Sequence, residues 1–385
     1  MSCVTHEQRT YGAFLLFGFA YLLPYSSVLA AVDYYKAVFG GRFMMQLTPF
    51  LSIPCLALLF MRVFLGCCPN DRLNVISGFS VLLLASVLAP IAVNPGFEIF
   101  VGVTISIGGA LAQGSLLAFA ACAGRGSSSA IQTGMGTSAV VAIFFRALAK
   151  LLAPTLYASL FIQFGITFVF VAVSFALYQT WFVKLEFMQD LLRIEEKTQP
   201  EMGEPLISNE LAEPRSGLKD NLWTLVTLRA LLFSATWNFF VSLAVFPGVV
   251  AQLPVNGLSD RQLQWFLLGM FSAFTSGDLI GKFLPSFSQL QLGSPNLVAF
   301  LVFLRTAFIP LLLFWRSRPA NPVVLLLTVF FIGGTNGYFG SMSFELIAVV
   351  VPDEKHRAYA GTAVTFFVLA GISLGSTFAS VAFRQ

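Results

Sequence analysis

The sequence predicts an all-α, polytopic membrane protein with eleven transmembrane helices. Of its 385 residues, 57% are hydrophobic and only 10% are charged, whereas a soluble domain carries about 25% charged residues. Apolar stretches near the ~20 residues that a helix needs to cross a bilayer recur from end to end, and the ten-residue alternation typical of a membrane barrel does not occur. The net charge of +4 is too small and too scattered to indicate nucleic-acid binding.

The eleven predicted spans follow one another in two runs. In order they are 11–33, 43–65, 73–94, 97–122, 131–152, 154–183, 221–247, 262–287, 295–315, 322–346 and 358–382. Prolines and glycines interrupt several of them, and such residues permit kinks and close helix approach in membrane proteins. Examples are Pro24, Pro49, Pro54, Pro247, Pro310, Gly108, Gly109 and Gly114.

Lys and Arg residues near the span ends predict the orientation. More of them lie on the side of the N-terminus than on the other side, when the intramembrane candidates Arg146, Lys282 and Arg305 are left out. We therefore expect a cytoplasmic N-terminus and, because the number of spans is odd, an extracellular C-terminus. The expected location is the plasma membrane.

One long polar stretch, residues 184–220, separates the two runs of spans. It holds about half of the acidic residues and almost no aromatic residues, a composition typical of disordered segments. We interpret it as a cytoplasmic linker between a six-helix bundle, residues 1–183, and a five-helix bundle, residues 221–385. Two such bundles indicate a carrier whose halves move against each other.

The eighth span carries a carboxylate and an ammonium group one helical turn apart, in FSAFTSGDLIGKFLP. A charge in the bilayer centre costs about 2.5–3.5 kcal/mol on insertion scales, so such residues normally face a partner or a cavity. Helical spacing places Phe271, Phe274 or Thr275, Asp278 and Lys282 on one face. This face suits a ligand with a flat ring and several hydroxyl groups. The alternative is a self-contained Asp278–Lys282 pair that only packs the bundle.

Four other spans also contain polar side chains. Arg305 in the ninth span has Asp278 as its best available carboxylate, and bonding to backbone carbonyls or to a distant loop is the alternative. Arg146 lies nearer a span end, and we expect its side chain to snorkel towards the membrane surface. The amides of Gln113 and Asn336 can each read the edge of a heterocyclic base, or bond to another helix.

Further motifs limit the class of function. FPGV, which contains Phe246 and Pro247, places a bulky ring beside a kink, where it can gate a pathway or pack the core. The sequence lacks P-loop and HExxH motifs, and both histidines lie outside the spans. Its five cysteines lack metal-ligand spacing. We expect a carrier that is not an enzyme and uses no cofactor or metal ion.

The order of the motifs resembles the equilibrative nucleoside transporter family. LLPYSS is similar to the family's L-L-P-W-N, LAQGS to its Q-G-S and GMGTSAVVA to the start of its fifth span. FPGV resembles F-P-A-V, LRTAFIPLLL resembles R-x-x-F-I/V-P-L, and TNGYFGSMSF and YAGTAVTFFVLAGISLGS resemble the closing segments. The resemblance covers all eleven spans. It implies a major-facilitator-like architecture of six plus five helices that works by alternating access.

The eighth span is similar to the family's F-N-x-x-D-x-x-G-R signature. This resemblance implies that Asp278 binds ribose hydroxyls with help from the basic residue one turn on. Thr275 stands where the family has asparagine, and Lys282 stands where it has arginine, so a point charge replaces a planar fork. The departures leave room for a member that prefers nucleobases.

The expected binding cavity takes residues from both bundles, by the same resemblance. Its expected lining consists of Leu22, Tyr25, Leu29, Gln113, Phe274, Thr275, Asp278 and Lys282. Gln113 is expected to contact the nucleobase. Phe246 and Pro247 are expected to form a thin outer gate, and Arg305 and Asn336 to have a gating or structural role.

The predicted function is transport of nucleosides, with nucleobases as further candidate substrates, by facilitated diffusion and alternating access. Three alternatives stay open: a proton-coupled symporter, a carrier of organic cations that pair with Asp278, and a membrane receptor that does not transport. The expected partners are a small-molecule substrate, purines included, and the lipid bilayer. The expected state is a monomer.

Overall fold

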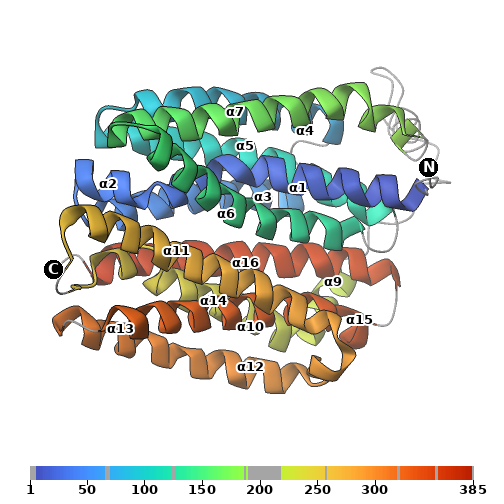
Figure 1. The fold of residues 1–385 in the computed structure, drawn as a ribbon. Coiled ribbons are helices and arrows are strands. Elements are labelled where there is room, and N and C mark those ends of the chain that lie inside the picture. Colours follow the sequence, from blue (N-terminus) through green and yellow to red (C-terminus); the bar gives the residue numbers. More distant parts are fainter. Residues whose placement is uncertain are drawn as a thin grey trace.

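The computed structural model describes residues 6–65, 70–123, 127–185, 188–189, 218–255, 258–318, 321–351 and 354–383. Within these ranges every element is an α-helix or a 3₁₀-helix, which confirms the predicted all-α class. Helices α1 to α7 lie together on one side of the bundle and α9 to α16 on the other (Figure 1). Helix α1 begins at one end of the bundle and α16 ends at the opposite end.

The first group of helices follows the first six predicted spans. Its elements are α1 (His6–Ala30), α2 (Val32–Phe39), α3 (Phe43–Leu65), α4 (Asp71–Leu88), η1 (Ala89–Ile91), α5 (Pro95–Cys122), α6 (Ser127–Leu152), α7 (Leu156–Thr180) and η2 (Phe182–Lys184). The first predicted span is interrupted, because a turn at Ala31 separates α1 from the short helix α2.

The second group follows the last five predicted spans. Its elements are α9 (Leu218–Thr227), α10 (Arg229–Val245), η3 (Val250–Gln252), α11 (Asp260–Phe283), η4 (Leu284–Ser286), η5 (Ser288–Leu290), α12 (Pro295–Leu304), η6 (Arg305–Ala307), α13 (Phe308–Ser317), α14 (Pro322–Glu345), α15 (Ile347–Val350) and α16 (Glu354–Ala382). The ninth span is broken at Arg305, near Pro310, which cannot donate a hydrogen bond to the preceding turn. Residues 186–187 and 190–217 of the predicted linker lie outside the described residues, so the linker stays a prediction.

Polar residues between the apolar stretches start several helices. Asn94 accepts a hydrogen bond from the N–H of Phe97 and precedes Pro95, the first residue of α5. Ser259 forms a capping box with Gln262 at the start of α11. Such side chains satisfy backbone donors that a helix start leaves unpaired. The caps explain why the predicted starts of these spans are close to the observed ones.

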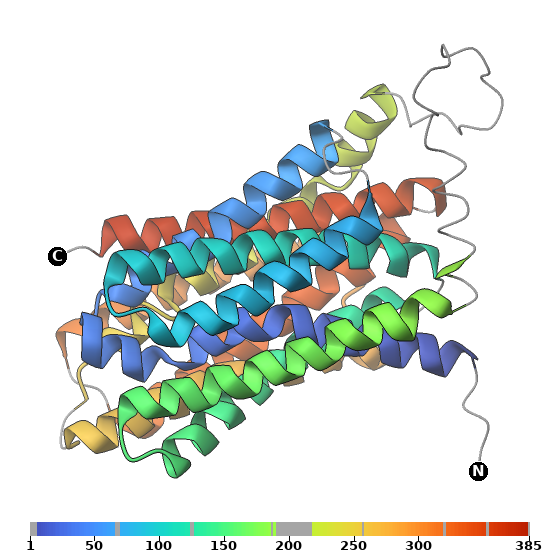
Figure 2. The same ribbon diagram turned by 90° about the horizontal axis from the view of Figure 1, so that it is seen from above.

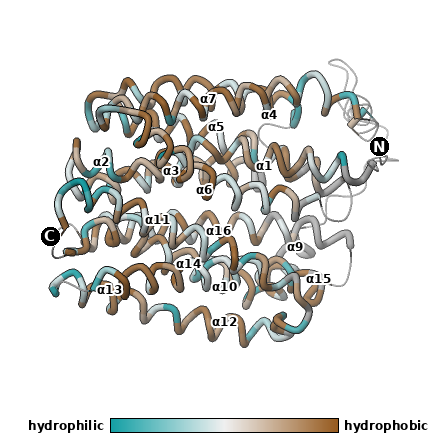
Figure 3. The backbone as a smooth tube through the Cα atoms, in the orientation of Figure 1, coloured by the Kyte–Doolittle hydropathy of each residue, from teal (hydrophilic) through white to brown (hydrophobic). Residues whose placement is uncertain are grey.

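Ten helical segments in the described ranges are long and apolar enough to cross a membrane, and they coincide with ten of the eleven predicted spans. The eighth span corresponds to α11, which is less apolar because it carries Asp260, Arg261, Asp278 and Lys282. Its 24 residues extend about 36 Å, which is still enough to cross ~30 Å of hydrocarbon. Hydrophilic residues gather towards the two ends of the bundle, and apolar residues occupy most of its length (Figure 3).

Two helix pairs carry most of the contact between the two groups. Helix α3 packs against α16, beside which it runs in Figure 2, and α6 packs against α11. The short helix α2 also contacts α11. Buried apolar side chains from both groups form one continuous core. We call the end of the bundle that contains α2 and η3 the α2 end.

Candidate functional site

Asp278 of α11 lies between two polar partners. Lys282 Nζ is 2.7 Å from Oδ2, one turn further along the same helix. Asn336 Nδ2 of α14 donates a 2.7 Å hydrogen bond to Oδ1. The side chains of Asp278 and Lys282 keep 13% and 27% of their surface exposed. Each carboxylate oxygen therefore has one protein partner and keeps a second lone-pair direction for another donor.

The short side chain of Asn336 reaches Asp278 because α11 and α14 are in close contact. A Cβ atom at Gly337 would collide with the carbonyl oxygen of Asp278, and one at Gly281 would collide with that of Gly334. Both glycines end a G-x-x-x-G sequence, a spacing that lets the backbones of two membrane helices touch. The glycines thus position the carboxylate against the amide.

Arg305 is buried and, within the described residues, makes no ion pair with Asp278. Its guanidinium donates hydrogen bonds to the backbone oxygens of Asn238 and Ile332 and to the side chains of Asn238, Ser242 and Thr335. The structure therefore shows the alternative in which Arg305 bonds to backbone carbonyls instead of pairing with Asp278. In the described ranges Arg305 is connected with Asp278 indirectly: it donates to Ser242, Ser242 donates to Asn336 Oδ1, and Asn336 donates to Asp278.

The expectation that Arg146 snorkels is wrong. Its side chain is fully buried, and Nε and Nη2 donate to the two carboxylate oxygens of Asp33 over 2.9 and 3.0 Å. Ser159 and Gln163 accept further hydrogen bonds from it, and Lys150 Nζ lies 2.9 Å from the same carboxylate. A bidentate carboxylate offsets the desolvation of the guanidinium. Asp33 was missed as a partner because it stands at the end of a predicted span.

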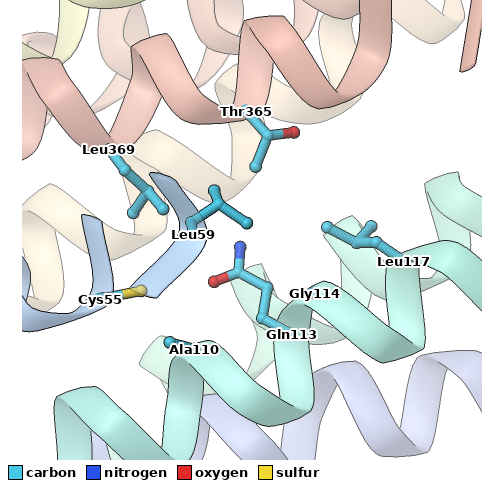
Figure 4. A pocket seen from close by; sticks show the side chains of 8 residues that line it. All are labelled: Cys55, Leu59, Ala110, Gln113, Gly114, Leu117, Thr365 and Leu369. Carbon is cyan, nitrogen blue, oxygen red and sulfur yellow. The ribbon is translucent and has the colours of Figure 1, made fainter. Parts of the chain in front are cut away.

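Gln113 lines a pocket between α3, α5 and α16 (Figure 4). Within the described residues its amide makes no hydrogen bond. The alternative role of Gln113, a hydrogen bond to another helix, is therefore not observed there. The pocket is a small hollow lined by Cys55, Leu59, Ala110, Gln113, Gly114, Leu117, Thr365 and Leu369. Its free volume of about 10 Å³ is far below the roughly 300–1,000 Å³ of typical ligand sites, so in this structure the hollow is too small for a ligand.

The predicted lining residues on α1 share one helix face. Leu22, Tyr25 and Leu29 are partly buried and pack against the core that both helix groups share. In the part of the chain that the structure describes, no hydrogen bond or ion pair joins Tyr25 or Gln113 to Asp278. The predicted cavity residues thus lie on several elements, and their joint action on a substrate stays a prediction.

Thr275 and Phe274 differ in their exposure. The Thr275 hydroxyl is half-buried and donates to the Phe271 carbonyl, which leaves its oxygen available as an acceptor. The Phe274 ring is buried and stacks on Phe246, with ring centroids 4.0 Å apart and an angle of 5° between the planes. Phe246, followed by Pro247, therefore covers Phe274 at the end of α10.

Contacts between the two helix groups close the α2 end. Lys36 Nζ donates a 2.6 Å hydrogen bond to the carbonyl oxygen of Ala251 in η3. Lys150 of α6 lies 4.6 Å from the ring centroid of Trp265 in α11. Gly248 packs directly on Met45 of α3. Three different helices of the first group thus contact the second group at this end.

Sequence reasoning missed two polar residues of α10 and a buried acid of α5. Asn238 and Ser242 are fully buried, stand four residues apart in an apolar span and both contact Asn336. The repeated polar spacing on one helix face is the signal that identifies them. Glu98 is also buried and accepts a 2.6 Å hydrogen bond from the Tyr35 hydroxyl.

Comparison with known proteins identifies a family. Residues 99–384 match the sequence profile of a family described as "Nucleoside transporter". "Equilibrative nucleotide transporter 1" of Arabidopsis thaliana is 24% identical, over 96% of this chain and 85% of that protein. "Equilibrative nucleoside transporter 4" of Danio rerio is 25% identical, over 97% of this chain and 83% of that protein.

A solved structure supports the fold. A bacterial homologue of the human lysosomal transporter Spinster, in an inward-facing and occupied conformation, aligns with a TM-score of 0.55 and 16% identity, over 99% of this chain and 82% of that one. At this identity the likeness concerns the fold alone. The profile match covers most of the chain and includes α11 and α14. The chain therefore belongs to the nucleoside transporter family.

Proposed function

We propose that this membrane transporter binds the ribose hydroxyls of nucleosides at Asp278 and the base at Gln113. The observation that carries this proposal is the fixed, partly exposed carboxylate of Asp278, which has one protein partner on each oxygen. The two neighbouring hydroxyls of a ribose can donate one hydrogen bond to each remaining lone-pair direction. Gln113 contributes an amide that can pair with both donors and acceptors of a base.

The mechanism that we propose is facilitated diffusion by alternating access. The contacts at the α2 end, such as Lys36 with Ala251, would break when the two helix groups rock apart. We assign the α2 end to the outside of the plasma membrane and the N-terminus to the cytoplasm. A monomer contains both groups of helices and needs no second copy to complete the cavity.

Nucleobases are included as substrates because Gln113 can bind a base without a ribose. The same argument predicts that a free base binds more weakly than its nucleoside, since it makes no contact with Asp278. Comparison of adenine and adenosine uptake in proteoliposomes tests this order of affinity.

Proton-coupled transport is the main alternative mechanism. Asp278 and Lys282 form an ion pair of 2.7 Å, which is neutral as a unit and needs no added proton. We therefore expect an imposed pH gradient to leave the final internal concentration of adenosine equal to the external one. Accumulation above the external concentration would contradict facilitated diffusion.

Transport of organic cations is the second alternative. Lys282 already supplies Asp278 with a cation, which favours a neutral polyol over an amine as the further ligand. Competition of labelled adenosine uptake by uridine and by a tetraalkylammonium ion separates the two substrate classes. Stronger competition by the ammonium ion would contradict the nucleoside site.

Asp278→Asn tests the site directly. The amide keeps the shape of the carboxylate but has one oxygen fewer to accept hydroxyl protons. We expect adenosine uptake in proteoliposomes to fall to the background level, while the purified protein keeps its elution volume. Asp260→Asn is the matched control, because Asp260 is an exposed acid in the first turn of the same helix. Normal adenosine uptake by the Asp278 variant would disprove the assignment.

A further inference from the structure

The amide of Asn336 lies between Asp278 and two side chains of α10. On one side, Nδ2 donates to Asp278. On the other side, Oδ1 accepts from the Ser242 hydroxyl over 2.8 Å and from Asn238 Nδ2 over 3.3 Å. Asn238, Ser242 and Asn336 are all buried. Water is therefore not available to replace the bonds among these three side chains.

The orientation of the Asn336 amide decides whether Asp278 receives a hydrogen bond. An amide rotated by half a turn would present its oxygen to the carboxylate, and neither oxygen can donate. Ser242 and Asn238 both present donors to Asn336 Oδ1. They therefore exclude the rotated amide, because rotation would place the NH₂ group against two donors and leave Oδ1 facing a negative charge.

Arg305 fixes the direction of both of these donors. A guanidinium has five N–H groups and no acceptor, and Arg305 uses them on five oxygen atoms. Its Nη2 donates to Ser242 Oγ over 2.8 Å, so the Ser242 proton points to Asn336 instead. Its Nη1 donates to Asn238 Oδ1, so the NH₂ group of Asn238 also faces Asn336. The hydrogen bonds that pass through Ser242, Asn238 and Asn336 thus all run from Arg305 towards Asp278.

We propose that Arg305, Ser242 and Asn238 are positioning residues for the substrate, which hold Asp278 through Asn336 in the orientation that binds a ribose diol. The inference rests on the proposed role of Asp278. A direct Arg305–Asp278 pair would take up both carboxylate oxygens with one planar fork. The indirect connection holds one oxygen by a single amide and leaves a lone-pair direction free on each.

Ser242→Ala is the mildest test of this connection. It removes the hydroxyl between Arg305 and Asn336 and leaves the other bonds of Arg305 in place. We expect the KM for adenosine to rise about tenfold, the scale of one such bond at ~1.4 kcal/mol. The KM for 2′,3′-dideoxyadenosine, which has the same base but neither ribose hydroxyl, is expected to change less than about twofold.

Two further variants make the test specific. Ser242→Thr restores the hydroxyl and should return the KM for adenosine towards the original value. Ser234→Ala is the matched control, because Ser234 is also fully buried in α10, and its hydroxyl donates to the Ala230 carbonyl of its own helix and to no other described residue. It should leave both KM values unchanged.

The outcomes separate this inference from the proposed site. If Ser242→Ala raises both KM values equally, or neither, the positioning role is wrong. If Asp278→Asn also leaves the ratio of the two KM values unchanged, the proposed ribose site is wrong as well. Loss of adenosine uptake in Asp278→Asn, together with an unchanged ratio of the two KM values in Ser242→Ala, would overturn only the positioning role. Elution profiles of the purified variants exclude misfolding as the cause.

Discussion

Among the described residues each group of helices buries one arginine, and the hydrogen bonds of the two guanidinium groups are satisfied in different ways. In the first group Arg146 forms a bidentate pair with Asp33, and Lys150 contacts the same carboxylate. In the second group Arg305 has no carboxylate partner among the described residues and donates only to hydroxyl, amide and carbonyl oxygens. A buried guanidinium is thus accommodated once by a carboxylate and once by neutral hydrogen-bond acceptors.

The difference determines which carboxylate is available to a ligand. Asp33 is 1% exposed, with both oxygens bonded to Arg146. Asp278 keeps 13% of its side chain exposed and is separated from Arg305 by Asn336. Direct pairing thus gives a closed structural element, and indirect connection leaves a carboxylate with free lone pairs. The first site should govern stability and the second should govern substrate affinity.

Asp33→Asn is the strongest test of the expected role of the Asp33 site in stability. It leaves the buried cations Arg146 and Lys150 without an anion, and loss of one partner of a buried pair typically costs ~3–5 kcal/mol. We expect the melting temperature of the detergent-purified protein to fall more than in any other single variant described here. Asp278→Asn, which alters a partly exposed pair, is the matched comparison and should change the melting temperature little while abolishing uptake.

The reverse result would contradict this division between stability and affinity. If Asp33→Asn keeps its melting temperature, its pair with Arg146 makes no net contribution. If Asp278→Asn lowers the melting temperature as much as Asp33→Asn, the carboxylate of α11 is chiefly a packing element. The double variant Asp33→Leu with Arg146→Met should recover part of the lost stability, because it removes both buried charges together.

The helices could be predicted from the sequence, and Asp278 could be recognised as an intramembrane charge, since apolar length and a charge inside a span are local features. The partners were harder to predict, because they depend on which helices are neighbours. Asp33 stands at a span end, and only the turn at Ala31 directs it towards α6. Asn336 was recognised as an intramembrane amide, but its contact with Asp278 depends on glycines that bring α11 and α14 together.

A matched pair of hydroxyl deletions should sharpen the comparison at a smaller scale. Ser159→Ala removes an acceptor of Arg146, and Thr335→Val removes one of Arg305. Each hydrogen bond to a charged group contributes about 1.5–3 kcal/mol, so both variants should lower the melting temperature moderately. Only Thr335→Val should also raise the KM for adenosine. An equal rise in KM for Ser159→Ala would show that both arginines influence the substrate.

The smallest expected effect concerns the contact between Lys150 and Trp265, which joins the two helix groups at the α2 end. A cation–π contact contributes about 0.5–1 kcal/mol at exposed sites and about 2 kcal/mol when desolvated. The lower range applies here because the charge of Lys150 is already paired with Asp33. Trp265→Leu should therefore raise the fraction of molecules open at the α2 end by about two- to fivefold and lower the external KM for adenosine by up to the same factor. Trp223→Leu is the control, because Trp223 of α9 is 61% exposed. An external KM that rises in Trp265→Leu would mean that Trp265 contacts the substrate rather than holding the closed end.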